Sequence, residues 1–122
     1  MSSPTPSSPE ERIQEEMARL EAYRNQLNAM LQQHQMLQSS RIDHERAQRS
    51  LDGIERAEDG RELLIPLGGE TYVRGTVQRR TPILIGIGSG VTVELPREQV
   101  VETLAQRITR IDSATRELEG QI

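Results

Sequence analysis

A glycine-punctuated segment in the middle of the chain, residues 63–95, constrains the fold more than any other feature. Apolar and polar residues alternate there with a period of two, which is the spacing of a β-strand that has one apolar face. Gly68-Gly69 and Ser89-Gly90 interrupt the alternation, and tight hairpin turns need the positive φ angles that glycine adopts without steric cost. The segment therefore predicts four short strands in two β-hairpins within residues 60–95. The residues on the predicted apolar faces are Leu63, Ile65, Leu67, Val73, Val77, Ile83, Ile85, Ile87, Val91 and Val93.

A long helix is predicted before the hairpins, over residues 9–59. Ser8 is a plausible N-cap, Pro9 fits the first helical position, and Glu58-Asp59-Gly60 ends the pattern. At about 1.5 Å per residue this helix extends roughly 70 Å, a length typical of a coiled coil. Its apolar residues step by three and four, and polar residues interrupt this seam in the second half at positions 34, 41, 44 and 48.

A second helix is predicted over residues 96–122, and its seam is more regular. The positions 101, 104, 108, 111, 115, 118 and 122 alternate steps of three and four. Because both helices leave the same pair of hairpins, we expect them to pair antiparallel, with partner numbers that sum to about 155. The predicted fold class is α+β, a long antiparallel two-helix coiled coil with two central β-hairpins. The polar seam residues of the first helix would then face aliphatic ones, which either loosens the pair or fixes its register. We expect the first outcome, because the polar residues are several.

This register leaves the first part of the long helix without a partner in its own chain. The second helix ends opposite about residue 33, and some twenty residues of the first helix extend beyond that point. The apolar residues on this overhang are Ile13, Met17, Leu20, Tyr23, Leu27 and Met30. Isolated hairpins are marginally stable in water and their free edges pair with other chains. We therefore expect the strands to be an oligomerisation platform and the overhang to be an exposed arm.

The remaining sequence excludes several classes of protein. Residues 1–8 form a Ser/Pro tract that is predicted to be disordered. We expect a soluble cytoplasmic chain, because we find neither a signal peptide nor an apolar run of the roughly 18 residues that a membrane span needs. The chain has no cysteine, and its net charge of −4 gives no electrostatic basis for binding nucleic acid.

The candidate catalytic and ligand-binding motifs are weak. Gly86-x-Gly88-x-Gly90 lies in a strand and a hairpin turn, whereas a phosphate loop needs a strand followed by a helix. His34 and His44 are ten residues apart on one helix, which is too far for a shared metal ion. We expect no catalytic residue, no metal site and no cofactor, so the chain is not predicted to be an enzyme.

The central segment resembles the alpha-class subunit of prefoldin, as the archaeal members have it. The similarity rests on Leu67-Gly68-Gly69, on Tyr72-Val73 and on residues 86–90, which match the "Pro-Leu-Gly" turn, the aromatic-valine strand and the "Gly-x-Gly-x-Gly" run of that family. Two hairpins in place of one mark the alpha class. The helices agree in placement but carry little specific sequence, so the resemblance covers about a third of the chain.

The resemblance implies a hexamer of two alpha-class and four beta-class subunits, whose hairpins form a double β-barrel platform. The tips of the projecting coiled coils would capture unfolded polypeptides and deliver them to a group II chaperonin without ATP. Residues 13–30 of the arm would then be the client-binding region. A different class of function is a structural coiled-coil adaptor, in which the same apolar arm binds one defined partner helix.

Overall fold

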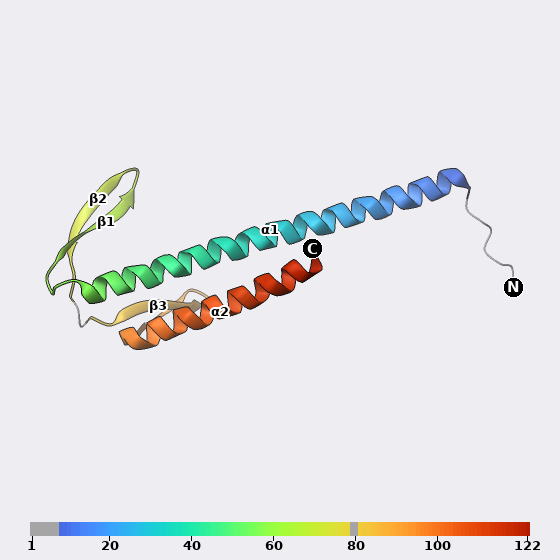
Figure 1. Ribbon diagram of the computed structural model, residues 1–122. Helices are drawn as coiled ribbons and strands as arrows, with labels where there is room; N and C mark the ends of the chain where they lie inside the picture. Colours follow the sequence, from blue (N-terminus) through green and yellow to red (C-terminus); the bar gives the residue numbers. More distant parts are fainter. Residues whose placement is uncertain (1–7, 79–80) are drawn as a thin grey trace.

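The computed structural model describes residues 8–78 and 81–122, so residues 1–7 of the tail predicted to be disordered lie outside the described part. The elements follow in the order α1 (Pro9–Arg56), β1 (Glu62–Gly68), β2 (Thr71–Thr76), β3 (Ile83–Gly88), β4 (Val91–Leu95) and α2 (Arg97–Gln121). Figure 1 shows α2 running along the second half of α1, while the first half of α1 extends beyond it. The α+β class with two long helices and two small hairpins is confirmed.

Local sequence sets the two ends of α1. The Glu11 amide donates to Ser8 Oγ at 3.2 Å, and the Ser8 amide donates to Glu11 Oε2 at 3.3 Å, a reciprocal capping box. Pro9 occupies the first turn, where its missing N–H costs no hydrogen bond. The chain leaves the helix at Ala57, which has extended backbone angles, so α1 ends three residues before the predicted boundary at residue 59.

The two hairpins are built on the same plan, and each is a separate two-stranded antiparallel sheet. In both, the register shifts by one residue just before the turn, between Pro66 and Gly68 and between Gly86 and Gly88. The shift is a β-bulge, and the glycine that ends it has a φ of +103° in the first hairpin and +110° in the second. Leu67 and Ile87 are the extra residues of the two bulges, so the predicted alternation ends at Pro66 and at Gly86.

The turns themselves are two residues long, and both central residues have positive φ. The second turn is Ser89-Gly90, at the residues predicted. The first turn is Gly69-Glu70, with Gly68 at the bulge, so the predicted Gly68-Gly69 turn is shifted by one residue. Glu70 adopts a φ of +61° although it has a side chain, because the bulge places the turn one residue later than the glycine pair suggests.

The core lies where the second hairpin meets the two helices. Leu51 of α1, Ile85 of β3, and Val100 and Leu104 of α2 form one buried cluster. A hydrogen bond adds to this packing: Arg107 Nη2 of α2 donates to the Gly86 carbonyl oxygen of β3 at 2.6 Å. The hairpin β3–β4 is therefore held on its own coiled coil.

The core cluster includes no residue of the hairpin β1–β2. Figure 1 shows it standing away from the helices, on the side of α1 opposite to α2. Val77, just after β2, is buried, but most of the hairpin is exposed. The two hairpins thus share one backbone plan and differ in what covers them.

Candidate functional site: the free arm and the exposed hairpin

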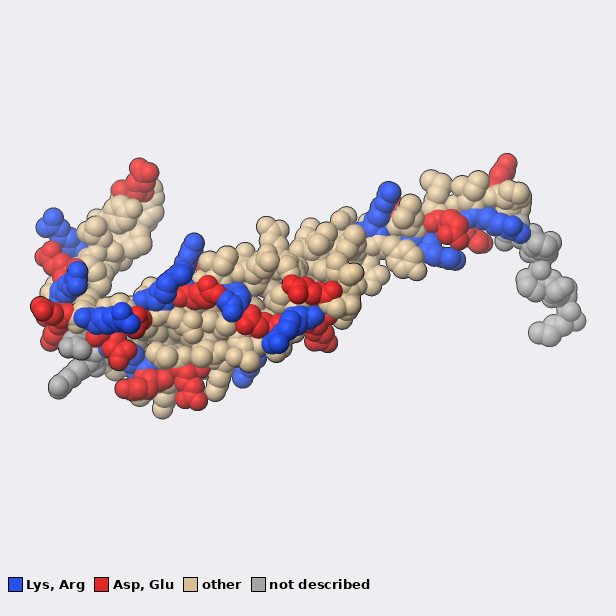
Figure 2. All heavy atoms as spheres, viewed as in Figure 1, with Lys and Arg blue, Asp and Glu red and all other residues tan. Residues whose placement is uncertain are grey.

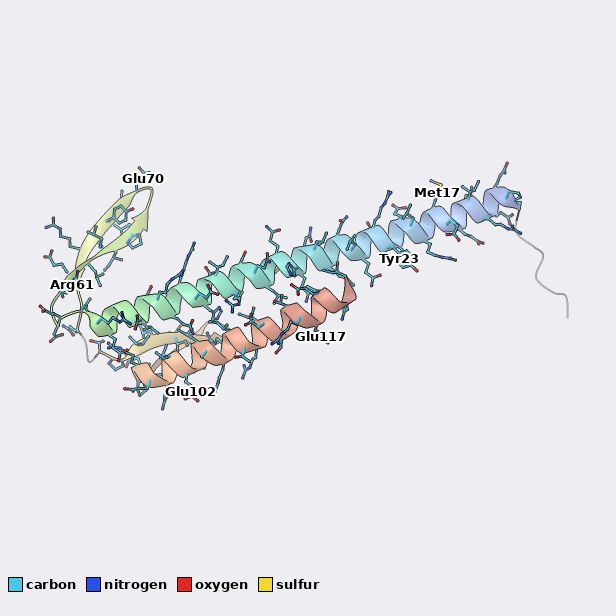
Figure 3. The ribbon with its side chains drawn as sticks, in the orientation of Figure 1. Met17, Tyr23, Arg61, Glu70, Glu102 and Glu117 are labelled. Atoms are coloured by element: carbon cyan, nitrogen blue, oxygen red, sulfur yellow. The ribbon has the colours of Figure 1, made fainter. Side chains whose placement is uncertain are left out.

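The first 22 described residues, from Ser8 to Ala29, are all exposed. Within this free arm, the side chains of Met17 and Tyr23 are 64% and 62% exposed. Figure 3 shows both projecting from α1 beyond the end of α2. Five of the six predicted arm residues are exposed, and Met30 is half-buried where the pairing with α2 begins. The exposed members are Ile13, Met17, Leu20, Tyr23 and Leu27.

Pairing between the helices starts at Met30 and follows steps of three and four. Leu118 of α2 is buried at the distal end of this paired region, and Leu51 and Leu104 pack together near its base. The numbers of this last pair sum to 155, as predicted. On α2 the seam starts at Val100, which is 2% exposed, whereas the predicted Val101 points to solvent. Val100 takes the buried position in place of Val101 because Ile85 of β3 packs on the side of α2 that carries Val100.

Polar residues join the two helices across the seam. Arg41 Nε donates to Asp112 Oδ1 at 2.6 Å and Arg41 Nη2 donates to Asp112 Oδ2 at 3.1 Å, so the guanidinium holds the carboxylate with two bonds. Arg41 also pairs with Glu45 on its own helix. Farther along the arm, His34 Nε2 lies 2.9 Å from Glu119 Oε1. Both cross-helix pairs sum to 153, within two residues of the predicted register.

These contacts change the interpretation of the polar seam. Arg41 was expected to face an aliphatic residue and to loosen the pair, and instead it meets a carboxylate. A paired polar contact at a seam position fixes the register, because any slip of the helices separates the two partners. The Arg41–Asp112 pair is partly exposed, so its main role is specificity of alignment.

The Arg41–Asp112 pair makes the helix pairing sensitive to acid. The hydrogen bonds and positive charge of Arg41 lower the pKa of Asp112 below its ordinary value. A carboxylate with a lowered pKa in the folded state stabilises that state above its unfolded pKa, and the stabilisation is lost as the pH falls through the folded pKa. In thermal unfolding followed by circular dichroism, we expect Asp112→Asn to be less stable than the parent at pH 7 and to match it near pH 2. The control Asp43→Asn changes an exposed residue of α1 and should melt like the parent at every pH. A stability loss for Asp112→Asn that is the same at pH 2 and pH 7 would show that the ion pair with Arg41 is not its cause.

The hairpin β1–β2 exposes apolar side chains on both faces. On one face, Ile65 and Val73 are directly paired and are 43% and 45% exposed. On the other face, Leu64 and Tyr72 are 62% and 58% exposed. An antiparallel hairpin of a soluble domain commonly has one apolar face and one polar face. Leu64 and Tyr72 were not among the predicted site residues. The adjacent leucines Leu63 and Leu64 are the sequence signal that indicates apolar side chains on both faces of this strand.

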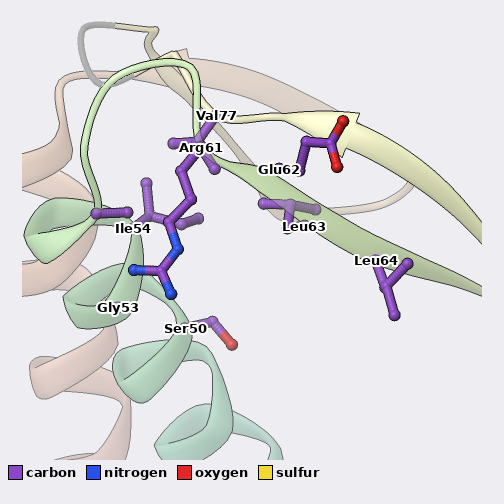
Figure 4. Close-up of a pocket in the computed structure, with 9 residues that line it drawn as sticks. Ser50, Gly53, Ile54, Arg61, Glu62, Leu63, Leu64 and Val77 are labelled. Atoms are coloured by element: carbon purple, nitrogen blue, oxygen red, sulfur yellow. The ribbon is translucent and has the colours of Figure 1, made fainter.

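A shallow groove of about 550 Å³ lies between the base of this hairpin and the end of α1. Figure 4 shows Leu63 and Val77 facing Ile54 across it, above Gly53 and Ser50 of the helix. The groove continues the exposed face that carries Ile65 and Val73. Figure 2 shows that the charged groups of this hairpin gather at its tip and base. The hairpin therefore presents an extended, mostly apolar surface.

The structure divides the predicted oligomerisation residues into two groups. One group is covered by the chain's own helices: Ile83, Ile85 and Val93 pack in or against the core cluster. The other group is exposed, apart from half-buried Leu63 and buried Val77: Ile65, Leu67, Val73, Ile87 and Val91 are open to solvent. Oligomerisation through either group stays a prediction, and the exposed group is the one free to meet another chain.

Other kinds of site find little support in the described part of the chain. Among residues 8–78 and 81–122, we find no cluster of three or more histidine or acidic side chains that would hold a metal ion. His34 and His44 have separate partners, Glu119 and the Ser40 carbonyl oxygen. Neither described helix has an apolar stretch long enough to cross a membrane.

Comparisons with known proteins point to one family. The "Prefoldin subunit" family model matches residues 23–122. "Prefoldin subunit alpha" of Methanocorpusculum labreanum is 31% identical over 114 residues, which cover 90% of this chain and 78% of the relative. The protein of the same name from Methanopyrus kandleri is 28% identical over 117 residues, covering 93% and 74%.

Solved structures agree on the fold. The filamentous PFD of Methanocaldococcus jannaschii superposes with a TM-score of 0.75 at 18% identity, over 86% of this chain and 87% of that chain. The prefoldin beta subunit of Thermococcus strain KS-1 gives a TM-score of 0.53 at 21% identity, over 99% and 81%.

Proposed function

The chain belongs to the prefoldin family of chaperones, and from this membership we propose that it is an ATP-independent holdase subunit in the cytosol. Its free arm captures unfolded polypeptides, and the assembled chaperone passes them to a group II chaperonin. The proposed client-binding residues are the six apolar positions of the arm. This role requires no catalytic group and no cofactor.

The observation that carries the proposal is the exposed apolar arm. Its apolar side chains are distributed over some twenty residues, and in the described part of the chain all of those up to Ala29 are exposed. Large exposed apolar surfaces mark interaction sites. Methionines at positions 17 and 30 suit a surface that accepts unrelated sequences, because the flexible thioether adapts its shape at little cost. Several arms acting on one client raise the avidity although each contact is weak.

Assembly follows from the exposed hairpin surfaces. We propose that the hairpins join this chain to beta-class prefoldin subunits, with two copies of this chain and four companions in a double β-barrel. The resemblance to archaeal alpha subunits supports this composition. The apolar faces of β1–β2 and the free edges of all four strands support hairpins as the joining elements.

A light-scattering assay tests the proposed function against the adaptor alternative. The chain, assembled with a beta-class subunit, is added to two unrelated proteins as they are diluted from denaturant. A holdase suppresses the aggregation of both proteins, with and without ATP. An adaptor that recognises one defined helix leaves both aggregation curves unchanged, and that result would overturn the proposed function.

A further inference from the structure

The exposed side chains of the free arm follow the same heptad as the paired part of α1. In the paired part, the residues at positions 30, 34, 37, 41, 44, 48 and 51 are buried or half-buried and alternate steps of four and three. The same steps continued toward the N-terminus reach Leu27, Tyr23, Leu20, Glu16 and Ile13, all of them exposed. The heptad phase therefore runs without a shift from the α1–α2 interface through the arm.

This unshifted phase indicates that the partner of the arm is itself a helix. The side chains of one helix enter the spaces of a facing helix only when both carry apolar residues at steps of three and four. The side chains of an extended segment repeat every two residues and do not match that phase. Two shallow grooves follow the seam of the arm, and Met17 and Leu20 line both of them. The arm is thus one half of a coiled coil, continuous with the interface that α2 covers.

The charged residue of the arm seam, Glu16, indicates the charge of the partner. In the paired part, Arg41 pairs with Glu45 on its own helix and with Asp112 across the seam. Glu16 pairs with Arg19 on its own helix at 3.3 Å, and its side chain is 70% exposed. A basic residue on the facing helix would complete the same arrangement with the signs reversed.

The tip of the arm extends this acidic character. Residues 9–16 carry four glutamates and one arginine, and Glu10 and Glu11 lie in the first turn of α1. A helix antiparallel to α1 brings its C-terminal end to this tip, and basic residues are favourable in the last turn of a helix. The charges of the arm therefore favour an antiparallel helix whose basic residues lie toward its C-terminal end.

We propose that the arm binds client segments as amphipathic helices that lie antiparallel to α1, in the register that α2 follows. Isolated helices of this length are marginally stable in water, so an unfolded segment becomes helical as its apolar face packs on the arm. The inference rests on the proposed function and names the kind of client segment that the arm takes. Any sequence with the right spacing satisfies it, whereas an adaptor requires one defined helix.

Synthetic peptides test the spacing. Two unrelated peptides of about 20 residues carry apolar residues at steps of three and four and an arginine opposite position 16, and a third has the same composition with apolar residues at every second position. Binding to the chain assembled with a beta-class subunit is measured by fluorescence anisotropy, and the part lost on Leu20→Asp is assigned to this arm. Both helical peptides should bind at least about ten-fold tighter than the third and gain helix in circular dichroism. Equal affinities, or binding without a gain of helix, would overturn the proposal.

A charge exchange tests the contact at Glu16. The parent should bind the peptide with arginine about five-fold tighter than its glutamate version, and Glu16→Arg should reverse this preference. Glu15→Arg is the matched control, because it makes the same change one residue away from the seam and should keep the parent's preference. The same reversal by both variants would show attraction by net charge alone, and no reversal by Glu16→Arg would show that the contact is absent.

Crosslinking tests the orientation, because the natural chain has no cysteine. Ile122→Cys should link to a peptide with an N-terminal cysteine and not to one with a C-terminal cysteine, and equal yields would contradict the antiparallel register. If Leu20→Cys links two copies and the helical peptides do not reduce that link, a second copy covers the arm and the proposal is wrong. If the spacing has no effect on peptide binding and clients are still protected, the inference fails alone; if the helices bind and clients still aggregate, the proposed function fails.

Discussion

Serine substitution of four arm residues should abolish the suppression of client aggregation and leave the assembly intact. The four are Ile13, Met17, Leu20 and Leu27, all exposed on α1. Burying one such side chain against a client contributes up to about 1.5–3 kcal/mol, and every 1.4 kcal/mol changes an affinity about ten-fold. Losing four per arm should weaken client binding by at least about a hundred-fold. The measurement is light scattering of a denatured client at increasing ratios of chaperone to client.

A matched control separates apolar contact from helix length and charge. Serine at Gln14, Ala22, Asn25 and Asn28 makes the same number of changes on the same stretch and removes little apolar surface. This variant should protect the client like the parent. Deletion of residues up to Gln26 should reproduce the loss seen with the apolar set. Full protection of the client by the variant with serine at positions 13, 17, 20 and 27 would show that the arm does not bind clients.

Aspartate at Ile65 and Val73 should prevent assembly with companion subunits. The two residues are cross-strand partners on the exposed hairpin, so in the free chain both carboxylates remain hydrated and the fold should persist. In an assembly that buries this face, each unpaired charge costs several kcal/mol of desolvation. The expected result is a loss of at least about a thousand-fold in the affinity between subunits, seen as complete dissociation at micromolar concentration.

Val101→Asp is the control for this change. Val101 lies on α2 and is 42% exposed, so the starting exposure is similar and the hairpins are not involved. Assembly should survive in this control. Assembly of the Ile65→Asp, Val73→Asp double variant would show that β1–β2 is not a joining element.

Much of the fold was accessible from the sequence because each element carries a local signal. The capping box at Ser8, the glycines of the hairpins and the three-four spacing of the helices act through neighbouring residues. The register followed from helix geometry alone, and Leu51 meets Leu104 as expected. Glu70 escaped prediction because the bulge at Leu67 displaces the turn, and a bulge leaves no mark in a period-two pattern.

What covers each apolar face could not be read from the sequence. Ile65 and Ile85 occupy equivalent places in two similar hairpins, yet one is exposed and the other is in the core. Alternation shows which residues share a face and does not identify the partner of that face. The Arg41–Asp112 pair was missed for a similar reason, since a shift of two residues in register exchanges an aliphatic partner for a carboxylate.

Size-exclusion chromatography with multi-angle light scattering tests most directly whether the central hairpins join several chains and hold the apolar arms apart. The chain, of 13.8 kDa, is measured alone and after mixing with a beta-class subunit. The expected result is one species in the mixture, with the mass of six chains that include two copies of this one. A 13.8-kDa monomer that persists beside the companion at every concentration would contradict it.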